Sequence, residues 1–227
     1  MRKWGLIFLA FFVVLPLIVL AGRDEFSGLS ERQTAILKDP SKVNKIIFLV
    51  NGEPVSEAEY LVVLEEVRNN LRMMQEMENE QVRVKLAIMK KYSPELIAFA
   101  GLLSDKVLFL AAENEGIEAP QTEVEEMVRK TEEMYRSGRL PSLQTIVQGY
   151  GESEYFGQYL PKVYREQLTK GLYLATKSGG ASPGEEARIT WELTKKAIAQ
   201  SRVRIVDPRP EFDVQKALAY LKEFWAQ

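Results

Sequence analysis

Apolar residues recur every three or four positions along most of the chain, which predicts a mainly helical protein. Ser56 and Glu59 form a capping box at the start of a helix over residues 57–77. The core-facing stripe of this helix is expected to contain Tyr60, Leu64, Val67, Leu71, Met74 and Met77. The sequence predicts further helices at 82–91, 94–114, 123–138, 140–147, 153–176, 185–200 and 214–225. Residues 94–114 are apolar on nearly all sides, so this helix is expected to be the most buried.

Two short apolar segments have strand character and lie at opposite ends of the helical region. Asn51-Gly52 is a strong turn signal directly after residues 46–50. Residues 202–206 alternate between polar and apolar positions. Because neither segment has another partner, we expect a two-stranded ribbon of 46–50 against 202–206 that closes the helical domain. In the helix over 153–176, Pro161 is expected to cause a bend or a break.

The N-terminus has the pattern of an export segment. Arg2 and Lys3 precede an uncharged, mostly apolar run over residues 4–21. The basic end is expected to stay in the cytoplasm, which places the remaining chain outside it. The length of the run favours a retained transmembrane anchor, whereas Val19-Leu20-Ala21 fits signal-peptide cleavage after Ala21.

We therefore divide the chain into four parts. Residues 1–22 are the signal peptide or membrane anchor, and residues 23–44 are a spacer. Residues 45–207 are the helical domain, and residues 208–227 are expected to form a C-terminal helix.

Composition excludes several classes of chemistry. The chain has no cysteine and no histidine, which removes thiolate and Ser-His-Asp catalysis and imidazole metal ligands. Its 30 basic and 32 acidic residues show no basic excess of the kind that nucleic-acid binding requires. We expect no enzyme activity, no cofactor, no metal and no nucleic-acid partner. Adjacent acidic pairs are interpreted as solvated helix faces; they are Glu65–Glu66, Glu125–Glu126, Glu132–Glu133 and Glu185–Glu186.

The order of two short motifs resembles a known family. Val-Asn-Gly-Glu-Pro-Val-Ser over residues 50–56 precedes a capped helix, and Ala-Ala-Glu-Asn-Glu-Gly-Ile over residues 111–117 ends a later one. Together with a Tyr150-Gly151 turn and a returning strand, residues 45–207 resemble the N-terminal chaperone domain of the SurA, PrsA and PpiD family of extracytoplasmic folding factors. The resemblance implies binding of unfolded exported polypeptides. Many members also carry a parvulin prolyl isomerase domain, and because only about 20 residues follow the last predicted strand, we expect this sequence not to include one.

A peptide-binding surface needs apolar side chains that remain exposed after the core is filled. Four candidates fall off the main helical stripes or in a turn: Met73, Tyr150, Tyr155 and Tyr159. Methionine adapts to varied apolar partners, and tyrosine offers a flat ring with a polar end. Packing at helix boundaries is the alternative role for each of them.

Two hypotheses of function remain. The first is a holdase-like module, membrane-tethered or secreted, that binds unfolded or exported polypeptides. The second is a membrane-tethered adaptor or structural subunit that binds one fixed protein partner. Both require an exposed apolar surface, so the sequence does not separate them.

Overall fold

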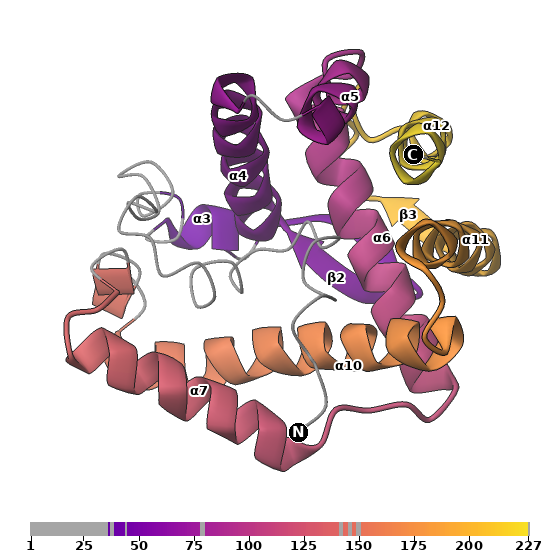
Figure 1. Cartoon of the computed structure of the whole chain (residues 1–227). Helices are drawn as coiled ribbons and strands as arrows, with labels where there is room; N and C mark the ends of the chain where they lie inside the picture. Colours follow the sequence, from indigo (N-terminus) through magenta and orange to yellow (C-terminus); the bar gives the residue numbers. More distant parts are fainter. Residues whose placement is uncertain are drawn as a thin grey trace.

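The structure is a computed structural model of the whole chain, and it describes residues 36, 39–43, 45–77, 80–140, 143, 144, 147, 148 and 151–226. The described part is mainly helical, with one small sheet (Figure 1). The first half contains α3 (Pro40–Val43), β1 (Ile46–Val50), β2 (Glu53–Ser56), α4 (Glu57–Glu76), α5 (Glu80–Met89), α6 (Pro94–Asn114) and α7 (Gln121–Arg136). The second half contains α9 (Glu152–Glu154), the π-helix Tyr155–Tyr159, α10 (Leu160–Ser178), α11 (Pro183–Gln200), β3 (Val203–Ile205) and α12 (Val214–Trp225).

Helix α6 is the centre of the fold, as its apolar sequence predicts. It packs against α4, α10, α11 and α12, and it runs through the middle of the molecule in Figure 1. Ser93 caps its first turn by accepting a hydrogen bond from the Leu96 backbone N–H at 3.2 Å. Helices α7 and α10 lie side by side below it.

The sheet has the order β2-β1-β3, and both pairs are antiparallel. The predicted pairing of residues 46–50 with 202–206 is confirmed: Phe48 lies opposite Ile205, and Val50 lies opposite Val203. The expectation of only two strands is wrong, because the Asn51-Gly52 turn folds β2 back onto β1 as a third strand. Pro54 is tolerated there because β2 is an edge strand.

Both residues of this turn have positive φ, 53° for Asn51 and 93° for Gly52. A side chain at position 52 meets no neighbouring atom but is conformationally strained. We therefore expect Gly52→Ala to lower the free energy of unfolding by about 1 kcal/mol in urea denaturation. The matched control is Gly171→Ala in α10, where helical φ and open space predict stabilisation by roughly 0.5–1 kcal/mol. Equal effects of the two substitutions would contradict this account.

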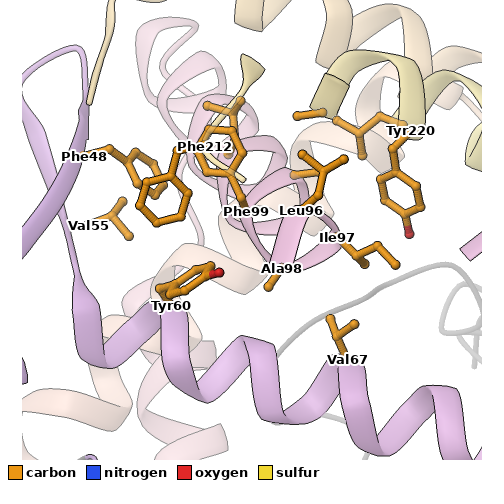
Figure 2. Close-up of a cluster of buried hydrophobic side chains, with 14 of the residues drawn as sticks. Phe48, Val55, Tyr60, Val67, Leu96, Ile97, Ala98, Phe99, Phe212 and Tyr220 are labelled. Atoms are coloured by element: carbon orange, nitrogen blue, oxygen red, sulfur yellow. The ribbon is translucent and has the colours of Figure 1, made fainter. Parts of the chain in front are cut away.

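The main core joins the sheet to α4, α6, α11 and α12. Four aromatic rings form its centre: Phe48 of β1, Tyr60 of α4, Phe99 of α6 and Phe212, which precedes α12 (Figure 2). The Phe99 ring centroid lies 5.3 Å from that of Phe48 and 5.1 Å from that of Phe212. The core is thus assembled from both ends of the described chain.

A second cluster of buried side chains lies between the start of α4, α7 and α10. The backbone here changes from α to π geometry over Tyr155–Tyr159, and the Leu160 N–H donates to the Tyr155 carbonyl five residues earlier. Pro161 has no N–H to donate to the Gly157 carbonyl, so a regular α-helical turn cannot form at this point. The predicted break in the helix at Pro161 is confirmed in this form.

The N-terminal segment of residues 1–22 and most of the spacer lie outside the described residues, so their assignments stay predictions. Within the described part of the chain, no helix combines the length and the apolar character needed to cross a bilayer.

Candidate functional site

The exposed apolar side chains of the described residues gather partly on two consecutive helices. Met73 and Met77 at the end of α4 are 39% and 54% exposed, and Val84 of α5 is 44% exposed. Met73 lies in the last turn of α4, and Met77 is the residue of extended backbone that directly follows the helix. We call these three side chains the α4–α5 apolar surface. Isolated exposed apolar residues are common, but α4 and α5 pack against each other, so we take these three side chains together as the candidate interaction surface.

This surface is exposed because α4 is buried in the core at its N-terminal end and becomes less covered toward its C-terminal end. Tyr60, Leu64 and Val67 are buried, whereas Leu71 and Met74 are only partly covered. Arg68 marks the change: its guanidinium donates to Glu65 at 2.7 Å and to Glu95 at the start of α6 at 2.8 Å. The expectation that Met77 faces the core is wrong, because the apolar stripe of α4 continues beyond the part of the helix that packs against α6.

The structure separates the four residues that the sequence predicts for polypeptide binding. Met73 is exposed, as expected, while Tyr150 lies outside the described residues. Tyr159 is partly buried and packs on the second cluster, with its ring centroid 5.6 Å from that of Tyr155. Tyr155 is 0% exposed, so the expectation that it is available to a client is wrong.

The two regions also lie far apart along α4. Val62, near the start of the helix, packs in the same cluster as Tyr155, and Met73 follows eleven residues later, which is roughly 16 Å at 1.5 Å per residue. A single binding site formed by Met73 and the tyrosines is therefore not what the fold provides. The sequence pattern does not identify Met77 and Val84 as exposed apolar residues. Val84 lies in a helix whose buried side chains are Leu86, Ile88 and Met89.

A separate pocket contains the least expected charges of the molecule. It is a cavity of about 60 Å³ with mainly apolar walls from α4, α6, α10, α11 and α12. Glu66 of α4, Asp105 of α6 and Lys170 of α10 line it. Lys170 is 2% exposed and donates to Asp105 at 2.7 Å. This ion pair gives the Asp105 carboxylate a partner and leaves the Glu66 carboxylate without one among the residues that the structure describes.

Glu66 has no hydrogen bond and no ion pair within the described part of the chain. Burial raises its pKa to about 8, with a further contribution from the negative charge of Asp105. The interpretation of Glu65–Glu66 as a solvated face is wrong for both residues: Glu65 is only 9% exposed and binds Arg68, and Glu66 faces the pocket. Strongly shifted groups in a cleft mark candidate functional sites.

Metal binding has no support in the described residues, which contain no group of three or more acidic side chains arranged to hold an ion. The pocket combines two carboxylates with an ammonium group, and the α4–α5 apolar surface has no catalytic groups.

The comparison with known families now gives the class of the chain. The SurA-like N-terminal domain matches residues 1–145, which is more than half of the sequence. The chain belongs to this chaperone-related family, as the motifs at residues 50–56 and 111–117 indicate. Searches of curated proteins and of solved structures found no match to the chain.

Proposed function

We propose that the protein is a chaperone-like module that holds unfolded polypeptides through the α4–α5 apolar surface. The observation that carries the proposal is the exposure of Met73, Met77 and Val84 on adjacent helices of a chain from a chaperone-related family. Flexible methionine side chains accommodate clients of different sequence. Three such contacts give weak binding for one client segment, which allows release without an energy source.

The test is suppression of aggregation by the full chain, purified in a mild detergent, when an unrelated denatured protein is diluted from urea. The variant Met73→Ser/Met77→Ser/Val84→Ser is expected to lower the suppression, measured by light scattering, at least fivefold. Each substitution removes about 1 kcal/mol of apolar contact with a client. Helix content and unfolding midpoint are expected to stay nearly unchanged, because all three side chains are already exposed.

The matched control is Gln75→Ser/Ala87→Ser, which changes two exposed residues on the same helices without removing large apolar side chains. It is expected to retain full suppression. Full suppression by the triple variant would move the binding surface away from α4 and α5. A wild-type chain that suppresses nothing but captures a single partner protein would instead support an adaptor.

A further inference from the structure

We propose that the pocket containing Glu66 is a binding site for an alkylammonium group, the chemistry of a lysine side chain or of a free primary amine. It is a second site, distinct from the α4–α5 apolar surface, and it does not depend on the proposed function. Four observations lead to it: the charge count in the pocket, the Glu66 carboxylate without a hydrogen-bond partner among the described residues, the aromatic wall and the size.

The charge count favours a cation. The ionisable side chains that line the pocket are Glu66 of α4, Asp105 of α6, Lys170 of α10 and Tyr220 of α12. With Lys170 paired to Asp105, one added ammonium group gives Glu66 a counter-ion and completes a second pair. An anionic ligand would instead meet two carboxylates, which opposes binding.

The aromatic wall suits the same ligand. Tyr220, Phe224 and Trp225 of α12 line the pocket, and ring faces attract ammonium groups. One of these rings already has such a neighbour, because the Lys85 Nζ of α5 lies 5.4 Å from the Phe224 ring centroid. The indole Nε1 of Trp225 is a buried donor that meets no acceptor within the described residues; because an ammonium group cannot accept a hydrogen bond, this N–H serves as a reporter of the pocket and not as a ligand contact.

The size sets the length of the ligand. A water-sized group needs roughly 10–15 Å³ of such a cavity, so 60 Å³ accepts about four to six groups, a range that includes an ammonium nitrogen with four carbons. Gly101 of α6 and Val63 and Val67 of α4 are part of the surrounding wall, which matches an aliphatic stem. Butylammonium is therefore a fitting probe.

Binding should increase with pH. Because Glu66 has a pKa of about 8, it is roughly one-tenth ionised at pH 7 and nine-tenths ionised at pH 9, and only the ionised form pairs with a cation. The affinity for butylammonium should then rise about ninefold over this interval. Asp105 is not expected to contribute this dependence, since its partner Lys170 holds it in an ion pair.

The experiment is a titration of the full chain with n-butylammonium chloride, followed by NMR of the Trp225 indole N–H, which Trp225→Phe identifies. The wild type should show a saturable shift that n-butanol, the uncharged analogue, does not cause. Glu66→Gln should lower the affinity at pH 9 at least fivefold and remove its pH dependence. Glu66→Asp, which keeps the charge on a shorter side chain, should retain the pH dependence with weaker binding.

A second arm identifies the source of the amine. An unfolded peptide with one lysine and its norleucine counterpart compete with butylammonium; competition by the lysine peptide alone assigns the pocket to polypeptide lysines. If neither peptide competes, the pocket serves free amines. Absence of a saturable shift, an equal shift with n-butanol, or unchanged binding by Glu66→Gln would overturn the proposal. The triple variant of the α4–α5 apolar surface should bind butylammonium normally, so failure of one proposal leaves the other standing.

Discussion

Replacing Phe99 by alanine is expected to lower the free energy of unfolding by about 4 kcal/mol. Phe99 is 0% exposed in the middle of α6, and its ring contacts Phe48 of β1 and Phe212 near the C-terminus. The substitution removes buried apolar surface and leaves a cavity among three elements that are distant in sequence. Since domains are stable by roughly 5–15 kcal/mol, a loss of this size removes a large part of the total.

The measurement is urea unfolding of the full chain followed by circular dichroism. Val84→Ala is the control, because it also shortens an apolar side chain but at an exposed position, and it should change stability by less than about 0.5 kcal/mol. A loss below about 1.5 kcal/mol for Phe99→Ala would show that the aromatic cluster is not the main contact between the sheet and α6.

Replacing Lys170 by methionine is expected to lower the free energy of unfolding by about 3 kcal/mol near pH 7. The substitution removes the ammonium that pairs with Asp105 and leaves that carboxylate beside Glu66 in the pocket. The expected loss lies at the lower end for broken buried pairs, because the Asp105 side chain is 29% exposed. Lys170→Met/Asp105→Leu should recover most of the loss, since apolar pairs replace buried ion pairs at little net effect.

The loss should depend on pH. Burial raises the pKa of Asp105, and the charge of Lys170 opposes this effect. Without Lys170 the folded-state pKa rises further above the unfolded value, so stability is retained at low pH, where the carboxyl is protonated, and falls as the pH rises toward neutrality. A deficit measured by denaturant unfolding that is the same at pH 4 and pH 7 would contradict this explanation. Lys195→Met, at an exposed lysine of α11, should show almost no deficit at either pH.

Local signals in the sequence predicted the element boundaries well. Ser56, Ser93 and Asp213 each cap the helix that was expected after them, and Asn51-Gly52 forms the expected turn. These signals act over two to four residues, so they need no knowledge of the rest of the fold. The pairing of the two distant strands was also predictable from their apolar, strand-like sequences, although the second partner of β1, the edge strand β2, was not.

The errors in the candidate site have tertiary causes. The apolar stripe of α4 does not reveal where the contact of this helix with α6 ends, so the periodicity alone places Met77 in the core, although it is exposed. For Tyr155, α-helical spacing aligns only Phe156 with the buried Leu160, whereas the π turn adds one residue and aligns Tyr155 with Leu160 as well, so Tyr155 is buried. The pocket at Glu66, Asp105 and Lys170 joins three helices, and no local pattern relates these positions.

The position of β3 has a consequence for how the chain reaches this fold. The Asn51 side chain accepts a hydrogen bond from the Arg202 backbone, across 151 residues, and β3 completes the sheet directly beyond it. Contacts of such long sequence separation slow folding, because a large loop must close before they form. During synthesis, the helices emerge long before β3 and Phe212, so the faces of β1 and α6 that these later residues cover stay open to solvent. The nascent chain therefore resembles, for that interval, the kind of aggregation-prone polypeptide that a chaperone protects.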